Sequence, residues 1–245
     1  MDKFLKRKPT DDAGPDDAKK QARVRPTFVV APGASGGDCA LLSAALGTLG
    51  RTCTIAGGKW AGNFPSQMGA NVALVEAAAS RAAADAPDAP VVLVGHSFGC
   101  RVVAALLVKH AAARDLPANV VLDGAVLESY PLYGDSPPKP TTDRAAAARA
   151  LPAEAKVLFL SGANDPFLNR TNKWRDAAAP TGAAALDAVL ADAPCRANCT
   201  VVAIDGAGHN ALKASKAKQE TARRTAIAAL KAHVRVLCPE KPAEK

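Results

Sequence analysis

The sequence predicts an α/β fold with a mainly parallel, six-stranded sheet and helices on both faces. Three observations predict it. Short apolar runs alternate with segments of helical spacing, which is typical of right-handed strand–helix–strand crossovers. The apolar runs are largely unbroken, as in strands that are covered on both faces. Most of them end at a glycine or a short polar loop, where the chain can turn tightly.

Six strands and five helices follow from this pattern. The predicted strands are 27–31, 51–57, 90–95, 119–129, 156–162 and 199–206. The predicted helices are 39–50, 70–84, 98–114, 172–192 and 211–236, the fourth broken at residues 180–182. In open sheets of this kind, functional side chains gather in the loops beyond the carboxyl ends of the strands.

We expect one domain. The chain has 245 residues, of which 49% are hydrophobic and 22% charged, as in a single soluble globular unit. Residues 1–25 are predicted to be a disordered charged tail, 26–238 the domain, and 239–245 a C-terminal tail. No long insertion separates the strands, so we expect a minimal cap, with 57–68 and 130–142 as the candidate lid segments.

The formal charge of +8 predicts no particular partner. The basic residues are spread along the chain, and their densest clusters, Lys6-Arg7-Lys8 and the last helix, are typical of solvated surfaces. We therefore expect neither a nucleic-acid nor a membrane partner, and protein partners and the oligomeric state stay open. The first residues lack an apolar leader, so we expect a cytoplasmic protein, with the nucleus as the alternative compartment.

In that compartment the six cysteines are expected to be free thiols. Cys195 and Cys199 could begin a zinc site, but no second pair follows at a suitable spacing. We expect no metal and no cofactor.

Ser97 is the candidate nucleophile. It stands in Gly95-His96-Ser97-Phe98-Gly99, a G-x-S-x-G motif between a predicted strand and a predicted helix. This context is typical of a nucleophile elbow, in which a strained turn lifts the serine hydroxyl clear of the sheet. Glycines are needed on both sides because a side chain there would collide with neighbouring backbone. A serine that only caps the helix is the alternative interpretation.

A serine hydroxyl is a poor nucleophile until a base takes its proton. His209 is the candidate base, because it follows the last predicted strand in a glycine-rich loop that can turn back over the sheet. His110 and His233 lie within predicted helices, and His96 lies inside the elbow itself. An ordinary loop histidine is the alternative interpretation.

The base in turn needs an acid that fixes its tautomer and stabilises its charged form. Asp165 is the candidate, since it follows the strand 156–162 at a turn, and the order serine, aspartate, histidine is the one used with such elbows. Glu128, at the end of the preceding strand, is the reserve acid. Asp205 is too close to His209 in the sequence to approach its ring easily.

The oxyanion of an acyl-transfer reaction needs two N–H donors. One should be the backbone N–H of Phe98, directly after the nucleophile, and the other should come from the loop after the first strand. Ala34 is the candidate there and Ser35 the alternative. The glycines of that loop, 33–37, fit neither the dinucleotide nor the P-loop pattern, so nucleotide binding is not predicted.

Together these residues resemble the α/β-hydrolases. More narrowly, they resemble the group of testis-expressed protein thirty and the NSL-complex regulatory subunit three, which is related to dienelactone-hydrolase-like enzymes. The resemblance covers about residues 26–236, and Pro32 departs from it where many relatives carry a histidine. The segments that carry it are "PGASGGD" (32–38), "NFP" (63–65), "GHSFGCR" (95–101), "SGANDPF" (161–167) and "IDGAGHN" (204–210). It implies Ser97 as nucleophile, Asp165 as acid and His209 as base.

We therefore expect a serine hydrolase, of the carboxylesterase or dienelactone-hydrolase-like type, that cleaves a small ester or related acyl compound through an acyl-enzyme. The alternative is a non-catalytic scaffold or regulatory subunit with the same fold, as some members of the resembled group are. Aromatic residues in the two candidate lid segments are predicted to line the acyl pocket: Trp60, Phe64, Tyr130 and Tyr133.

Overall fold

The computed structural model describes residues 24–34, 39–55, 60, 67–133, 143–169 and 180–239. Within them lies one six-stranded sheet in the order β2-β1-β3-β4-β5-β6, and every neighbouring pair of strands is parallel. The predicted fold class is confirmed. The strands are β1 (Thr27–Ala31), β2 (Arg51–Thr54), β3 (Val91–His96), β4 (Val120–Glu128), β5 (Lys156–Gly162) and β6 (Cys199–Ile204).

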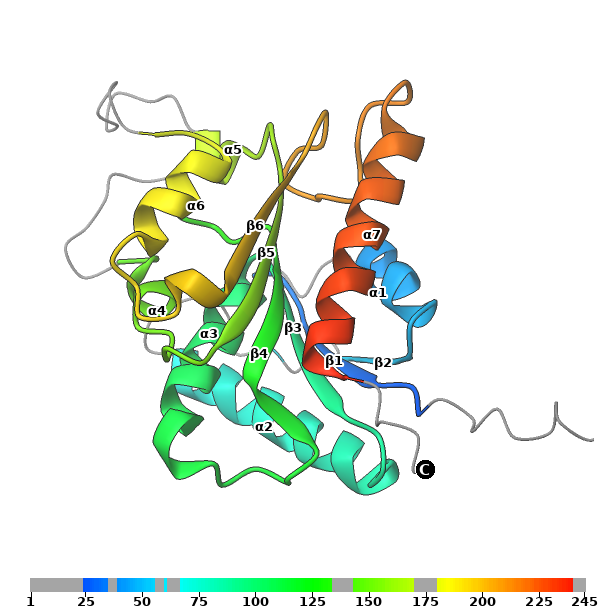
Figure 1. Ribbon diagram of the computed structural model, residues 1–245, viewed down its shortest axis with the longest axis vertical. Helices are drawn as coiled ribbons and strands as arrows, with labels where there is room; N and C mark the ends of the chain where they lie inside the picture. Colours follow the sequence, from blue (N-terminus) through cyan, green and yellow to red (C-terminus); the bar gives the residue numbers. More distant parts are fainter. Residues whose placement is uncertain are drawn as a thin grey trace, which may run out of the picture.

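Helices cover both faces of this sheet. Figure 1 shows α1 and α7 on one face, and α2, α3, α4 and α6 on the other. The helices are α1 (Ala40–Gly47), α2 (Met68–Asp85), α3 (Phe98–Ala113), α4 (Ala146–Arg149), α5 (Pro166–Asn169), α6 (Ala183–Leu190) and α7 (Gln219–Leu237), with a 3-10 turn at Arg196–Asn198. The short α4 and α5 were not predicted from the sequence, because four residues carry no helical period.

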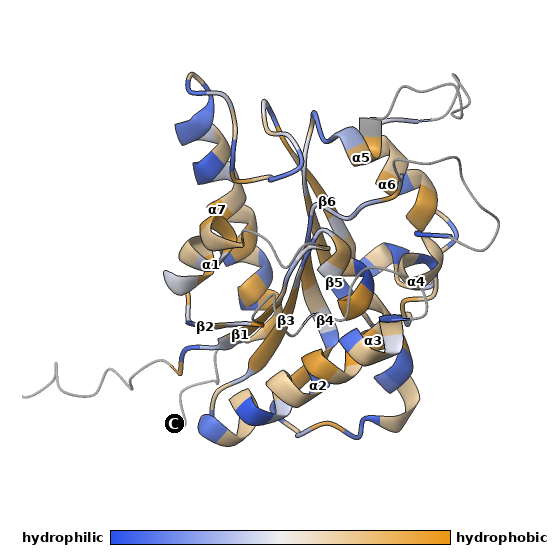
Figure 2. Ribbon diagram, turned by 180° about the vertical axis from the view of Figure 1, so that it is seen from behind, coloured by the Kyte–Doolittle hydropathy of each residue, from blue (hydrophilic) through white to orange (hydrophobic). Residues whose placement is uncertain are grey.

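Two hydrophobic cores hold the layers together, one on each face. Successive residues of a strand point to opposite faces, so Phe28 and Val30 pack with the α1 and α7 side, whereas Val29 and Ala31 pack with the α2 and α3 side. Figure 2 shows the corresponding hydrophobic colour along the strands in the middle of the molecule. Burial on both faces explains why the strands are unbroken apolar runs.

The last helix differs from its prediction. It begins at Gln219 and not at residue 211, because the segment before it makes other bonds. Ala211 and Leu212 are buried in the core, and the N–H of Ala211 donates to a side chain of β4. The Gln219 side chain then closes the segment, accepting from the N–H of Ala214 at 2.8 Å and donating to the Leu212 carbonyl at 2.7 Å.

Several predictions of the sequence lie partly or wholly outside the described residues. They concern the two tails, apart from the few residues next to the domain, and most of both lid segments. The predicted helix 172–192 is described only from residue 180, and there α6 begins after Gly182, whose φ of 57° suits a glycine. None of the helices in the described ranges is long and apolar enough to cross a membrane.

The buried His233 of α7 makes the stability of the fold depend on pH. Its Nε2 donates to the carbonyl of Ala125 in β4 at 3.0 Å, and burial lowers the pKa of His233. His233 is then protonated more easily in the unfolded chain than in the folded one. The stability that the neutral, buried His233 contributes is therefore present at neutral pH and is lost as the pH falls below about 6.5. We expect the free energy of unfolding to fall between about pH 7.5 and about pH 5.5, and to fall less in His233→Gln, which keeps a donor that does not titrate.

Urea unfolding of both proteins at the two pH values measures this difference. The other titrating groups are common to both proteins, so only His233 can separate the two slopes. Equal losses of stability in wild type and variant would contradict the assignment.

Candidate active site

Ser97 occupies a strained turn at the junction of β3 and α3. Its φ is 50° and its ψ is −118°, a backbone conformation that costs a residue with a side chain about 1–3 kcal/mol. A Cβ on Gly99 would lie 2.1 Å from the carbonyl oxygen of Ala31, and one on Gly95 would lie 2.5 Å from the Cα of Cys100. Both positions therefore need glycine, as the sequence predicts.

Hydrogen bonds fasten this turn to the neighbouring strand. The N–H of Ser97 donates to the carbonyl of Glu128 in β4 at 2.9 Å, and the N–H of Cys100 donates to the carbonyl of Ser97 at 2.9 Å. The Cys100 thiol donates to the carbonyls of Gly95 and Glu128 at 3.2 Å and 3.1 Å. Burial raises the pKa of Cys100, so the thiol stays protonated and remains a donor. The turn is held by packing and by backbone bonds together.

His209 reaches Ser97 from the loop after β6. Its Nε2 lies 2.8 Å from the Ser97 Oγ, and the ring is partly exposed. The loop passes directly over the end of β5: a Cβ on Gly162 would lie 2.0 Å from the carbonyl oxygen of Gly208. The N–H of Asn164 also donates to the carbonyl of Ala207 at 2.9 Å. A glycine at the end of β5 thus lets the histidine loop fold back toward β3.

Asp165 holds the other side of the same imidazole. Both of its carboxylate oxygens lie 3.1 Å from His209 Nδ1, and the residue is fully buried. The N–H of Phe167 donates to Oδ1 at 2.8 Å, which fixes the carboxylate. A carboxylate can only accept, so His209 Nδ1 carries the proton and Nε2 is left to accept from the Ser97 hydroxyl.

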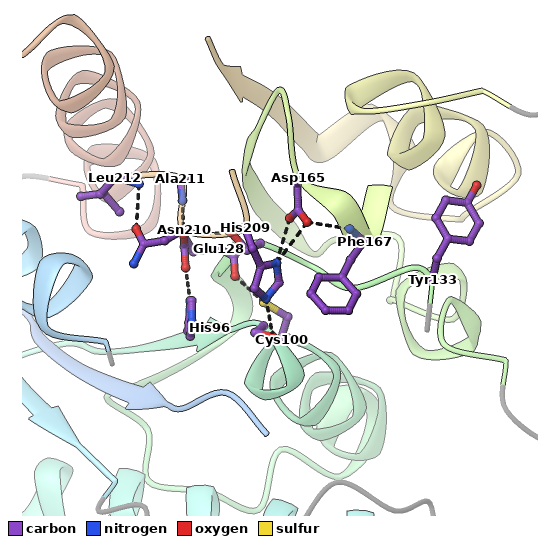
Figure 3. Close-up of polar contacts among 12 residues, drawn as sticks. His96, Cys100, Glu128, Tyr133, Asp165, Phe167, His209, Asn210, Ala211 and Leu212 are labelled. Carbon is purple, nitrogen blue, oxygen red and sulfur yellow. Dashed lines mark hydrogen bonds and ion pairs between the residues drawn. The ribbon is translucent and has the colours of Figure 1, made fainter. Parts of the chain in front are cut away.

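Figure 3 shows His209 beside Asp165, with the Phe167 ring packed against it. The two rings meet edge to face, with their centroids 4.4 Å apart. Phe167 was part of the motif at 161–167, but no role for its side chain followed from the sequence. Its place could have been suspected only from its position two residues after the candidate acid.

Glu128, the reserve acid, lies elsewhere in the site. Its carboxylate pairs with Nδ1 of His96, and it also accepts from the Ser129 hydroxyl at 2.9 Å and from the Ala211 N–H at 2.6 Å. Of the two candidate acids, only Asp165 has a hydrogen bond to His209 among the contacts described here. The pairing of Glu128 with His96 did not follow from the sequence, in which no role for His96 was predicted.

The candidate oxyanion donors come from two neighbouring segments. Phe98 is the first residue of α3, so its N–H is one of those left unpaired by the helix itself. Gly33 lies against the elbow, since a Cβ on it would be 3.4 Å from the Cβ of Ser97. Ala34 follows directly and is exposed at the surface. The alternative donor, Ser35, is outside the described residues.

The four residues predicted to line a pocket fall into different places. Trp60 is partly buried and its ring meets that of Phe98 edge to face, with centroids 6.1 Å apart. Tyr130 is fully buried in the core, and its hydroxyl donates to the Arg144 carbonyl at 2.8 Å. Its side chain therefore packs inside the molecule and does not face a surface pocket. Phe64 lies outside the described residues.

Tyr133 is partly buried in the loop that follows β4. Its N–H donates to the carbonyl of Phe167 at 3.0 Å. Figure 3 shows its ring on the far side of Phe167 from His209. Tyr133 is thus the predicted pocket residue that is tied by its backbone to the segment carrying the candidate acid.

The two cysteines that could begin a zinc site lie side by side. The Sγ atoms of Cys195 and Cys199 lie 3.2 Å apart, and both residues are buried. In the part of the chain that the structure describes, no group of three or more histidine, cysteine and acidic residues is placed to hold a metal ion.

Comparisons with known proteins identify the fold. No protein-family model and no curated protein matches the chain. Among solved structures, a monoacylglycerol lipase from Paleococcus ferrophilus has a TM-score of 0.55 at 12% identity, over 86% of this chain and 97% of the other. XC6422 from Xanthomonas campestris, an α/β serine hydrolase without a lid, has a TM-score of 0.52 at 18% identity, over 91% and 88%.

A third structure, an α/β serine hydrolase homologue from Coxiella burnetii, has a TM-score of 0.52 at 16% identity, over 83% of this chain and 85% of the other. The chain therefore has the α/β-hydrolase fold. At sequence identities this low, structural similarity shows a shared fold but does not show a shared reaction. The narrower resemblance to the group of testis-expressed protein thirty stays a prediction.

The close approach at Gly99 can be tested by substitution. We expect Gly99→Ala to destabilise the protein by about 3 kcal/mol or more, because the new Cβ meets backbone that cannot move aside cheaply. Gly69→Ala is the matched control: nothing lies within 4 Å of a Cβ at this position in α2, so its stability should be unchanged or slightly higher. Thermal unfolding of both variants measures the difference, and equal melting temperatures would show that the elbow has room for a side chain.

Proposed function

We propose that this protein is a serine hydrolase that cleaves a small ester or a related acyl compound. One observation carries the proposal: the His209 ring lies between the Ser97 hydroxyl and the Asp165 carboxylate, within hydrogen-bond distance of both. A hydroxyl, an imidazole and a buried carboxylate in this order are the parts that acyl transfer to serine requires. That three solved structures with this fold are serine hydrolases or a lipase supports the same class.

In the proposed reaction, Ser97 Oγ attacks the acyl carbonyl while His209 Nε2 takes the hydroxyl proton. Asp165 stabilises the resulting imidazolium and keeps its orientation. The N–H groups of Phe98 and Ala34 receive the oxyanion, each worth about 2.7–4 kcal/mol in the transition state. His209 then returns the proton to the leaving group, and an acyl-enzyme forms. Water activated by the same histidine releases the acid and restores the serine.

The partly exposed imidazole of His209 can be reached from the surface, and we propose a small acyl compound as the substrate. Among the described residues, the ring of Trp60 lies beside Phe98 and the ring of Phe167 lies beside His209. A carboxylesterase or a dienelactone-hydrolase-like enzyme would fit these features. We propose one domain over 26–238 and a cytoplasmic location, with no metal or cofactor taking part.

The activated serine can be tested with a fluorophosphonate probe. We expect the wild-type protein to be labelled at one site and Ser97→Ala to lose the label completely, because the probe reacts only with a serine whose proton is taken by a base. Ser43→Ala is the control. Ser43 bonds the Thr54 hydroxyl away from the site, so its loss should leave labelling unchanged.

Absence of labelling in well-folded wild-type protein would favour the alternative function, a non-catalytic scaffold with the same fold. Intact-mass spectrometry of the labelled protein reads out the stoichiometry.

The role of the acid can be tested by removing its charge. We expect Asp165→Asn to lower kcat for a p-nitrophenyl ester by about 10⁴-fold, since an amide no longer imposes the tautomer that leaves Nε2 free to accept. Asp205→Asn is the matched control: this aspartate is exposed, pairs with Lys218, and should leave kcat within about twofold of wild type. A variant at Asp165 that keeps full turnover would exclude it as the acid.

A further inference from the structure

Glu128 is a fully buried carboxylate with an unusual set of partners. Its Oε1 accepts from the Ser129 hydroxyl and the Ala211 N–H, and its Oε2 pairs with His96 Nδ1. The Ser129 hydroxyl and the Ala211 N–H donate to it, so Glu128 acts as an acceptor, and His96 Nδ1 takes the donor role toward its other oxygen. A buried polar group is costly unless it is bonded in this way. The mechanism above uses none of these bonds.

The position of Glu128 in the sheet explains what its bonds join. β4 lies between β3, which ends at the elbow, and β5, which ends at the candidate acid. Ala211 is two residues beyond His209, so its bond to Glu128 fixes the histidine loop after it has crossed β5. Figure 3 shows Glu128 between Ala211 and His96. One side chain thus connects the loop of the base to the motif of the nucleophile.

His96 extends this connection to the first loop. It directly precedes Ser97, and its ring is 5.9 Å from the ring of His209, centroid to centroid. A Cβ on Gly33 would lie 3.4 Å from the His96 Cδ2 and 3.8 Å from its Nε2, so the ring packs against the residue before Ala34. The His96 ring therefore lies between Glu128 and the loop proposed to supply an oxyanion donor.

We propose that Glu128 is a positioning residue of the hydrolase, and that with His96 it forms a second carboxylate–imidazole pair that keeps the active-site loops in register. The inference rests on the proposed function. Glu128 acts through other groups: through Ala211 on the position of His209, and through His96 on the elbow and on Gly33. It does not touch the reacting atoms.

The backbone bonds of Glu128 strengthen this assignment. Its carbonyl accepts from the N–H of Ser97 and from the Cys100 thiol, so the same residue is bonded to the elbow by its backbone and to the histidine loop by its side chain. A small displacement of β4 at this point would alter both sides of the site together. Misplacement of about 1 Å at an active site can cost about a hundredfold in rate.

The test compares Glu128→Gln, Glu128→Ala and Asp123→Asn. Gln retains an oxygen that can accept from Ala211, but its NH₂ cannot replace the carboxylate toward His96 Nδ1 in the same tautomer. Ala removes every side-chain bond. Asp123→Asn is the control, because it removes a carboxylate from the same strand at a distance from the site.

Each variant is titrated with the fluorophosphonate probe, and kcat for the p-nitrophenyl ester is expressed per labelled site. We expect kcat to fall about tenfold in Glu128→Gln and about a hundredfold in Glu128→Ala, with KM within about twofold of wild type and labelling slowed in parallel. Asp123→Asn should match wild type. A purely structural glutamate would lower the number of labelled sites without lowering kcat per site, and that result would overturn the inference.

The outcomes separate this inference from the proposed function. If the wild-type protein is neither labelled by the probe nor able to hydrolyse the ester, both the proposed function and the inference about Glu128 are wrong. If the wild type is active and Glu128→Gln has an unchanged kcat per labelled site, only the inference about Glu128 is wrong. Should Glu128→Ala fail to fold, Glu128→Gln decides by itself, since its side chain has nearly the same shape as the glutamate.

Discussion

The close contact of backbone with backbone at the elbow is the constraint on which the site depends. Without a side chain at Gly99, the end of β1 can lie against the first turn of α3, and without one at Gly95, β3 can lie against the backbone of Cys100. Ser97, between these two contacts, takes its positive-φ turn, and its hydroxyl lies 2.8 Å from His209 Nε2. The strain is held because the packing of β1, β3 and α3 on both sides determines the backbone path.

The parallel sheet supplies the second half of the arrangement. All six strands run the same way, so the loops after β3, β4, β5 and β6 emerge at one rim. Glycine at position 162 then allows the loop after β6 to cross β5 and approach β3. Groups from distant parts of the chain meet there, and bonds between the loops hold them together.

Much of this could be predicted from the sequence because the signals are local. The elbow was predicted from a G-x-S-x-G motif that lies between a predicted strand and a predicted helix. Asp165 and His209 became candidates because each lies in a loop that directly follows a predicted strand. What could not be predicted depends on contacts between distant residues. The late start of α7 is accompanied by the bond of Ala211 to Glu128, which lies 83 residues earlier in the chain, and the buried Tyr130 bonds the carbonyl of Arg144. The pairing of Glu128 with His96 could not be predicted either, because 32 residues separate the two in the sequence.

The strand order has one further consequence. Ser97 follows a strand in the interior of the sheet, whereas His209 follows β6, the edge strand of the sheet in the described residues. The loop of His209 is closed by side-chain bonds from Gln219 and Glu128 and not by helical turns. Local opening of a loop beside an edge strand breaks fewer contacts than unfolding of the interior strands. We therefore expect the loop of His209 to open locally at a lower free energy than the elbow that carries Ser97.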